Sequence, residues 1–397
     1  MKLQNRVISP TLNKNELWRL TGKIDRLEVP WSLNDLQQKA LLDFKKAQED
    51  GTIKFVPKMN CACGAEQPIH FANTDRFGLQ IDSYVCEKCG LIYTSPVLSP
   101  DSIKPFYENH YHHMHFGSPP SPDKTLYKKG QGKKIYDLLK RWFDSNEINV
   151  LEVGCGSGSV IKEFIKAAVA DGHKAKGIGL EYSHEYVECF DPEGLNVKIL
   201  NGDLHNLDPS PRPYNVIIMS HVFEHFLEPH MELQALKQFI NEQTLVFIEI
   251  PGIFSLKYRY EYDCDYLKYF TFAHIYNFNL TSLTNLLNNN GFGLLWGNEE
   301  VEGIFLLGEQ RTDTSENKTE VISYLRDLET NKMYFSRLPE IIVENSQQIT
   351  MNSHEIKKLV SDMQYVKSFV DKILSTFPFN LVNNVRKFFK KQKLPTL

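Results

Sequence analysis

From Ile148 onward, short apolar stretches alternate with stretches of helical spacing, and this pattern limits the fold of the chain more than any other feature. The apolar stretches are INVLEV (148–153), KAKGIGLE (174–181), NVKILNG (196–202), YNVIIMSH (214–221) and TLVFIEIP (244–251). Strands that alternate with helices form a parallel sheet that helices cover on both faces. A helix, LTSLTNLLNNNG, and two strands near GFGLLWGN and GIFLLGEQ are expected to complete this α/β fold.

The first predicted strand runs into a glycine-rich loop, LEVGCGSGS, which opens a helix. Gly154, Gly156 and Gly158 allow a sharp turn and bring backbone N–H groups close to a ligand. Such a loop alone is a weak signal, shared by dinucleotide-binding folds and structural turns. Glu181 strengthens the signal, because it ends the next strand, 23 residues after Gly158, where a carboxylate can bind two ribose hydroxyls.

Polar positions also stand at the carboxyl ends of the third and fourth strands. Asp203, in NGDL, lies within reach of an adenine amine, and SHVFEH (220–225) lies at the mouth of the sheet. Ligands of open α/β sheets bind at the carboxyl ends of the strands. These positions together therefore predict a cofactor site with nucleotide character.

The motifs LEVGCGSG, GLEYS, NGDL and SHVFEH follow one another between about Ile148 and Gln310. In order and spacing they resemble the class I S-adenosylmethionine-dependent methyltransferases. A nicotinamide-binding fold is the weaker alternative, because SHVFEH and the closing pair of strands favour the methyltransferase. The resemblance implies a Rossmann-like sheet and S-adenosylmethionine (SAM) as the cofactor.

By the same resemblance, the methionine part of the cofactor is surrounded by Glu152 and the three glycines. The other implied cofactor-binding residues are Glu181 on the ribose, Tyr182 against the adenine and Asp203 on its amine, together with Leu204 and Ser220. An ion pair near the strand end is the alternative role of Glu152.

Four of the seven cysteines lie within 29 residues, as Cys61 and Cys63 and then Cys86 and Cys89. In a chain without a secretion signal, clustered pairs indicate metal ligands before disulfides. A CxC pair followed by a CxxC pair matches a closed, tetrahedral zinc site of four thiolates, which is structural because no position is left for water. Reduced cysteines in a core are the alternative.

CEKCGLIYTSP, followed by FYENHY, resembles the N-terminal zinc-binding module of methyltransferases from sugar and surface-polysaccharide pathways. Those modules usually begin with CxxCG, whereas this chain has CACG, so Cys61 stands one residue closer than the family pattern requires. Such modules lie over the cofactor cleft. The resemblance therefore implies that Tyr107 or Tyr111 helps to close the cleft, and a place in the core is the alternative.

Methyl transfer to an alcohol requires alignment with the donor and removal of the hydroxyl proton. A histidine suits the second task, because its pKa lies near neutrality. His221 and His225 are four residues apart, which predicts one helical face, with Glu224 nearby to orient a ring. His274 follows the fifth strand, in a segment that lines acceptor pockets in the family that the chain resembles. A structural role, or a divalent ion held with the carboxylate, is the alternative for these histidines.

The acceptor implied by the zinc-module resemblance is a sugar of a surface polysaccharide, of the O-antigen or capsule type, or its nucleotide-sugar precursor. O-methylation is favoured over C-methylation, because C-methylating relatives have a further α/β domain after the core. The aromatic insertion of residues 254–272 offers stacking faces for a sugar, although such density also suits a core. A methyltransferase for a lipid or small metabolite and a SAM-binding assembly scaffold are the alternatives.

Nucleic acid is not expected as a partner. The net charge is -4, and SHVFEH differs from the DPPY-like segment of methylases that act on base amines of nucleic acids.

Beyond residue 311 the strands stop and a seven-residue period begins. One position of the period holds Ile342, Ile349, Ile356, Met363 and Val370, and the position three residues later holds Asn345, Asn352, Leu359, Val366 and Ile373. Buried Asn residues at the second position would fix the register and the number of strands. The period predicts a coiled coil and a homo-oligomer through residues 340–374. A helix packed on its own domain is the alternative.

The last residues combine an apolar helical face with basic residues on the remainder, Arg386, Lys387, Lys390, Lys391 and Lys393. This pattern is typical of a helix on an anionic membrane surface. Contact with glycan-assembly enzymes and a basic disordered tail are the alternatives.

The predicted order is an N-terminal extension (1–57), a zinc-binding module (58–120), a methyltransferase domain (121–310), a helical region (311–378) and a basic tail (379–397). In the extension, a helix is expected after Trp31, with Ser32 as its N-cap. No apolar run reaches 18 residues, and the N-terminus lacks the apolar stretch of a signal peptide. We therefore expect a cytoplasmic protein that is peripheral on the cytoplasmic face of the inner membrane.

Overall fold

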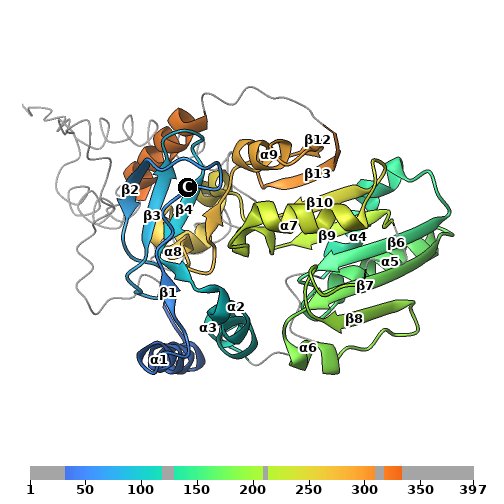
Figure 1. Cartoon of the computed structure of the whole chain (residues 1–397), viewed down its shortest axis with the longest axis horizontal. Coiled ribbons are helices and arrows are strands. Elements are labelled where there is room, and N and C mark those ends of the chain that lie inside the picture. The colour runs from blue at the N-terminus through green and yellow to red at the C-terminus, as the bar shows by residue number, and fades with distance from the viewer. Residues whose placement is uncertain (1–31, 119–128, 209–212, 309–316, 333–397) are drawn as a thin grey trace, which may run out of the picture. The chain divides into compact units, whose positions relative to one another are not determined.

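The computed structural model describes residues 32–118, 129–208, 213–308 and 317–332 (Figure 1). The described residues form two compact units, one within residues 32–253 and 270–322, the other of residues 254–269 and 323–332. The predicted coiled coil and the basic tail lie outside the described residues. None of the helices in the described part of the chain is both long and apolar enough to cross a bilayer.

The first unit contains a seven-stranded sheet in the order β12-β13-β10-β9-β6-β7-β8. Its strands are β6 (Glu147–Val153), β7 (Lys174–Glu181), β8 (Val197–Asn201), β9 (Val216–Ser220), β10 (Leu245–Glu249), β12 (Phe292–Gly297) and β13 (Glu302–Leu307). The five strands from β10 to β8 are parallel, and β13 and β12 are antiparallel at one edge. All the strands expected from the apolar pattern are present, and the closing pair makes the sheet mixed.

Helices cover both faces of this sheet. Successive side chains of a strand point to opposite faces, and the fully buried Val150 and Leu151 accordingly belong to different apolar clusters. Val150 clusters with side chains of α4 (Gln131–Leu139) and α5 (Ser159–Ala170), whereas Leu151 clusters with those of α7 (Pro229–Leu236) and α9 (Leu280–Asn288). Burial on both faces explains why these strands are apolar throughout rather than alternating.

A second, four-stranded antiparallel sheet in the first unit carries the cysteine pairs, in the order β11-β4-β3-β2. Three strands come from the predicted module: β2 (Pro68–Ala72), β3 (Asp82–Cys86) and β4 (Ile92–Ser95). The fourth, β11 (Tyr276–Asn277), comes from the segment after β10. The strands β1 (Phe55–Val56) and β5 (Val97–Leu98) form a separate two-stranded antiparallel sheet. The module is therefore completed by a strand from the methyltransferase part.

The helix expected after Trp31 is α1 (Asp35–Glu49), but its N-cap is Asn34 and the prediction of Ser32 was wrong. Asn34 and Gln37 cap one another: each side chain accepts a hydrogen bond from the other residue's backbone N–H. This reciprocal pair satisfies two free N–H groups at once, which favours a start two residues later.

A longer helical segment follows β5, made of α2 (Pro100–Phe106), the π-helical turn η1 (Tyr107–Tyr111) and α3 (His112–Phe116). The remaining short elements of the first unit are η3 (Lys140–Trp142), α6 (His184–Glu188), η4 (Phe223–His225) and η5 (Lys237–Phe239).

The second unit holds most of the aromatic insertion, as η6 (Ile253–Tyr258), η7 (Tyr260–Tyr262) and α8 (Tyr266–Tyr269). Residues 317–332 are helical. Within this unit the ring of Tyr324 lies 4.9 Å from that of Phe254, and its hydroxyl accepts a hydrogen bond from the Lys257 N–H at 3.0 Å. Tyr266 and Tyr269 are buried, so these rings serve the core rather than offering free stacking faces.

Candidate active site and cysteine cluster

The glycine loop between β6 and α5 is built from three residues of positive φ, namely +65° at Gly154, +54° at Gly156 and +71° at Gly158. A Cβ atom at Gly154 would lie 2.3 Å from a methyl of Val222, and one at Gly158 would lie 2.6 Å from a methyl of Ile199. A Cβ at Gly156 would meet nothing within 4 Å. The first and third glycines are thus enclosed by protein, while the second faces open space that a ligand can fill.

Two carboxylates hold this loop in place. Glu152 is fully buried, and its Oε2 accepts a hydrogen bond from the Ile161 N–H in the first turn of α5 at 3.0 Å. Glu181, at the end of β7, accepts from the N–H groups of Gly156 at 2.8 Å and Ser183 at 2.9 Å. The Glu181 carboxylate is therefore fixed beside the open side of the loop.

Asp203 follows the end of β8, and nearby residues donate hydrogen bonds to both of its carboxylate oxygens. Tyr182 donates its hydroxyl to Oδ2 at 3.0 Å, and the His205 N–H donates to Oδ1 at 2.9 Å. Burial raises the pKa of Tyr182 above its usual range, so the hydroxyl remains a donor. Leu204 is buried in the core, and Ser220 ends β9. The strands β9, β6, β7 and β8 are neighbours in the sheet (Figure 1). The predicted cofactor residues lie at or just after the carboxyl ends of these strands.

Sequence reasoning missed Glu249 and Gln131 at the same edge. Glu249 ends β10, and its carboxylate accepts from Ser220 Oγ at 2.9 Å and from Gln131 Nε2, which lies 2.7 Å from both oxygens. A carboxylate at a strand end was the signal used for Glu181, and the same signal would have found Glu249. Gln131, at the start of α4, stands out by no pattern in the sequence.

Beside this edge, three imidazoles surround one buried carboxylate. Glu224 is 2% exposed, and neither carboxylate oxygen has a hydrogen-bond partner among the described residues. Its Oε1 lies 3.7 Å from His221 Nδ1, 3.8 Å from His225 Nε2 and 4.0 Å from His274 Nε2. The structure therefore brings together all four residues proposed for the chemistry, which we call the histidine cluster.

The predicted helical face of His221 and His225 is wrong. His221 has a φ of +58°, and helical structure is limited to the single 3₁₀ turn of Phe223–His225. A left-handed residue followed by a tight turn points both rings at Glu224 without a helix. The His221 N–H donates to the Glu249 carbonyl at 2.7 Å, which fixes this turn at the end of β9.

His225 has the orientation of a proton acceptor. Its Nδ1 lies 2.8 Å from the carbonyl oxygen of Ala273, and a carbonyl can only accept, so Nδ1 carries the proton and Nε2 carries the lone pair. Because Nε2 faces Glu224, the carboxylate stabilises the positive charge that the ring gains with a second proton. Burial holds the pKa of His274 well below its usual range, so this ring is neutral near pH 7.

Tyr107 and Tyr111 stand between the cofactor residues and the histidine cluster. Tyr107 stacks on Tyr182 with ring centroids 6.4 Å apart and meets His225 edge-on at 5.8 Å. Tyr111 meets His225 edge-on at 5.6 Å. Both tyrosines belong to the π-helical turn η1, a local form that is frequent at functional sites.

The four clustered cysteines meet in the first unit. The Sγ atoms of Cys61 and Cys89 are 3.6 Å apart, as are those of Cys63 and Cys86, and all four lie within 4.8 Å of one another. Zn–S bonds of about 2.3 Å in a tetrahedron separate sulfurs by about 3.8 Å, so the arrangement fits such an ion despite the short CxC spacing.

The thiols and turns of this cluster suit metal binding. Hydrogen bonding within the cluster lowers the pKa of Cys63 and Cys86 and raises that of Cys61 and Cys89, so two of the four thiols favour the thiolate form. Tight turns close each pair, with the N–H of Gly64 bonded to the Cys61 carbonyl and that of Gly90 to the Cys86 carbonyl. The ligand atoms of Glu224, His225 and His274 also lie within 4.8 Å of one another, a set that a divalent cation could bridge.

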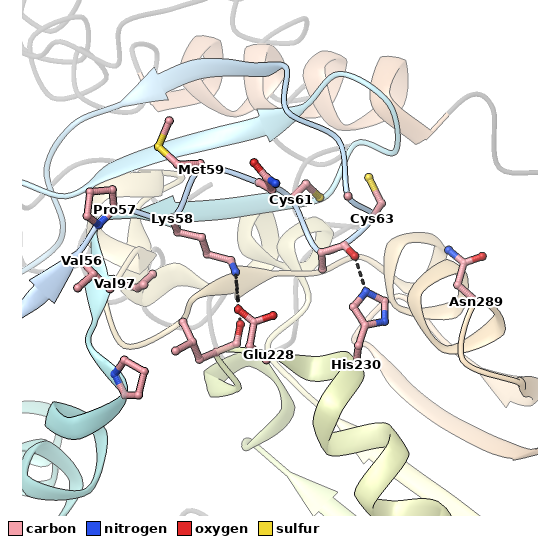
Figure 2. A pocket seen from close by; sticks show the side chains of 15 residues that line it. Val56, Pro57, Lys58, Met59, Cys61, Cys63, Val97, Glu228, His230 and Asn289 are labelled. Atoms are coloured by element: carbon pink, nitrogen blue, oxygen red, sulfur yellow. Dashed lines mark hydrogen bonds and ion pairs between the residues drawn. The ribbon is translucent and has the colours of Figure 1, made fainter.

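A cavity of about 900 Å³ lies beside the first cysteine pair (Figure 2). Cys61 and Cys63 line one side, together with Lys58, and Glu228 and His230 line another. The residues lining it include neither the predicted cofactor residues nor the histidine cluster. This cavity is therefore distinct from the candidate active site.

Comparison with known proteins agrees with this picture of the fold. Residues 127–295 match the family model of a methyltransferase domain. We conclude that residues 127–295 of the chain form a methyltransferase domain.

Solved structures with some likeness include three methyltransferases. The plantazolicin methyltransferase BpumL in complex with SAH is 14% identical, with a TM-score of 0.37 over 52% of this chain and 82% of that chain. A SAM dependent methyltransferase from Aquifex aeolicus is 20% identical, with a TM-score of 0.35 over 47% and 97%. Coclaurine N-methyltransferase bound to N-methylheliamine and SAH is 21% identical, with a TM-score of 0.26 over 30% and 35%. These likenesses are too low to indicate an acceptor. None of the curated proteins compared with the chain matches it.

Proposed function

We propose that the protein transfers the methyl group of SAM to a hydroxyl oxygen of a sugar and that His225 removes the hydroxyl proton. The observation that carries this proposal is the position of Tyr107, whose ring contacts Tyr182 on the cofactor side and His225 on the other. The residues suited to the cofactor and those suited to proton removal therefore adjoin one another. Such proximity is what an in-line transfer between donor and acceptor requires.

In the proposed reaction His225, Glu224 and His274 have different roles. SAM, when bound, supplies a methyl group on a positively charged sulfur. As the acceptor oxygen forms its bond to the methyl carbon and the carbon–sulfur bond breaks, the hydroxyl proton passes to Nε2 of His225. The bond from Nδ1 to the Ala273 carbonyl keeps the ring oriented, and Glu224 stabilises the imidazolium. The neutral ring of His274 is a second group that can contact the acceptor.

The sugar acceptor, in a surface polysaccharide or its nucleotide-sugar precursor, is supported by the resemblance of CEKCGLIYTSP and FYENHY to modules of those pathways. The test is incubation of the purified protein with methyl-labelled SAM and a panel of nucleotide sugars, glycans, lipids and small metabolites. We expect label on a sugar oxygen, located by mass spectrometry of the product. Label on a lipid or small metabolite alone would refute the sugar acceptor. SAM binding without transfer to any of these acceptors would favour a scaffold.

Zinc is the ion that we propose for the four cysteines, because four thiolates at tetrahedral spacing are typical of structural zinc. Elemental analysis of the purified protein should give one zinc per chain, and Cys86→Ser should lose it. A second equivalent of metal that is lost in His274→Ala would place an additional cation in the histidine cluster. Zinc retained by Cys86→Ser would contradict the four-thiolate site.

A further inference from the structure

The first cysteine pair is bonded to the segment that follows Glu224 and His225. The imidazole of His230, at the start of α7, donates from Nε2 to the carbonyl of Ala62, the residue between Cys61 and Cys63. The other nitrogen, Nδ1, accepts from the side-chain amide of Asn290 at 2.8 Å. One tautomer satisfies both contacts, so the ring forms a fixed link between the module and α7.

Lys58 forms a second link to the same segment. Its Nζ donates to the Leu227 carbonyl at 3.3 Å and lies 3.6 Å from the Glu228 carboxylate. The Leu227 carbonyl also accepts from the hydroxyl of Tyr276 at 3.4 Å. The lysine side chain is only 9% exposed, and a buried ammonium group is tolerated only where partners of this kind replace water.

The second cysteine pair is connected to the segment that carries His274. The chain runs from Cys89 into β4, and β4 pairs with β11 through Tyr93 opposite Tyr276. At the end of this pairing the Thr94 N–H donates to the carbonyl of Ile275, the residue after His274, at 3.0 Å. The predicted zinc-binding module (58–120), which we call the cysteine module, therefore contacts both the segment that carries His225 and the segment that carries His274.

Figure 2 shows how the first links are arranged. Residues 56–64 and residues 227–230 line the same cavity from different sides. The contacts from Lys58 to Glu228 and from His230 to the Ala62 carbonyl cross between these segments. These polar links join the two segments in addition to the apolar cluster that includes Cys61 and Leu227.

We propose that the cysteine module positions the histidine cluster, with Lys58 and His230 as positioning residues that transmit the folded state of the zinc site to His225 and His274. This inference rests on the proposed function for the role of zinc and of the cluster. Neither residue belongs to the proposed cofactor or acceptor contacts. The proposal therefore predicts that these links affect turnover and the environment of the histidine rings, but not cofactor affinity.

The first test is Lys58→Met, which keeps the length of the side chain and removes the charge and its donors. The matched control is Lys162→Met, because Lys162 also bonds one backbone carbonyl, that of Asp191 at 3.0 Å, and one carboxylate, that of Glu193 at 2.6 Å. Four quantities are measured on the full chain: zinc content, SAM affinity by calorimetry, kcat and KM, and the imidazole NMR signals of His225 and His274 in cofactor-free protein.

We expect Lys58→Met to keep its zinc and its SAM affinity, to lower kcat by about tenfold or more, and to shift both histidine signals. Lys162→Met should change none of these. Unchanged kcat and unchanged histidine signals in Lys58→Met would overturn the proposal.

His230 gives a second test that decides the question if Lys58→Met loses zinc or folds poorly. His230→Ala removes the donor to Ala62, whereas His230→Gln retains an N–H donor at the end of its side chain. The alanine variant should lower kcat and shift the signals, and the glutamine variant should restore most of both. Equal behaviour of the two variants would contradict a positioning role.

Removal of zinc by a chelator separates this inference from the proposed function. If the module positions the cluster, the signals of His225 and His274 should shift on zinc removal while SAM affinity is retained. This readout does not depend on turnover, so it remains informative even if no acceptor is methylated. Signals that stay in place after zinc is lost would refute the coupling and leave the proposed methyl transfer intact.

Discussion

At the scale of single residues, the site depends on how burial sets the charge of each side chain. Glu224 is buried without a hydrogen-bond donor among the described residues, so the nearby rings are the groups that can compensate its charge. His225 presents a lone pair to it, whereas burial keeps His274 neutral. The arrangement favours a proton moving to His225, since the imidazolium so formed lies 3.8 Å from the Glu224 carboxylate.

The stability of the protein should fall as the pH is lowered below about 6.5. Burial, together with Arg76, His225 and His112, holds the pKa of His115 well below its usual range in the folded protein. The unfolded chain binds this proton near pH 6.5, so below that pH the unfolded state gains protons that the folded state cannot. The free energy of unfolding then falls by up to about 1.4 kcal/mol per pH unit for each such histidine.

Thermal unfolding between pH 7 and pH 5 measures this effect. His115→Gln should reduce the fall in Tm with decreasing pH relative to the wild type. His184→Gln is the control, because His184 is 66% exposed. An identical pH dependence of Tm in the wild type and His115→Gln would contradict the burial argument.

At the scale of elements, two glycines allow the backbone strain of a substitution to be distinguished from its effect on cofactor binding. Gly156 and Gly172 both have positive φ, +54° and +92°, and a Cβ atom at either would meet nothing within 4 Å. An alanine at either position therefore carries the same type of backbone strain, about 1–2 kcal/mol. Only Gly156 faces the proposed cofactor site.

Gly156→Ala should lower SAM affinity by at least tenfold, while Gly172→Ala should leave it unchanged, although both lose a similar amount of stability. Calorimetric titration with SAM and thermal unfolding of the two variants measure these effects. Equal SAM affinities in the two variants would show that the cofactor does not approach the loop at Gly156.

The strands of the large sheet could be predicted because burial on both faces requires a continuous run of apolar residues, such as the run that ends at Val153. The positions of the glycine loop and of Glu181 and Asp203 could be predicted because they stand at strand ends, and their role in cofactor binding stays a prediction. The smaller sheet could not be predicted in full, because β11 is only two residues long and its partner β4 lies far away in the sequence. The same limit applies to Asn317, whose amide donates to the Cys89 carbonyl at 2.7 Å.

At the scale of the whole molecule, the sequence predicts that the methyltransferase domain is followed by an oligomer-forming region and a basic tail. The heptads of residues 340–374 and the basic residues 386–393 stay predictions, as do the homo-oligomer, the membrane surface and the cytoplasmic location. We propose that oligomer formation multiplies the weak membrane affinity of a single short helix.

Two nested truncations test this arrangement. A chain ending at residue 378 should remain oligomeric but lose binding to anionic vesicles, and a chain ending at residue 332 should also become monomeric. Light scattering after size-exclusion chromatography measures the first property, and co-sedimentation with anionic and neutral vesicles measures the second. Vesicle binding that survives in the shorter chains would place the membrane contact elsewhere, and an oligomer that survives in the chain ending at 332 would exclude the coiled coil as its cause.

In the proposed reaction, SAM and the acceptor meet at the histidine cluster and His225 takes the proton. The most direct test of this reaction is the single-turnover rate of methyl transfer from SAM already bound to the protein, measured for the wild type and for His225→Gln at saturating acceptor. We predict that the rate falls by about 10²–10⁴-fold in the variant while the SAM affinity stays unchanged. Equal rates of methyl transfer in the two proteins would contradict this prediction.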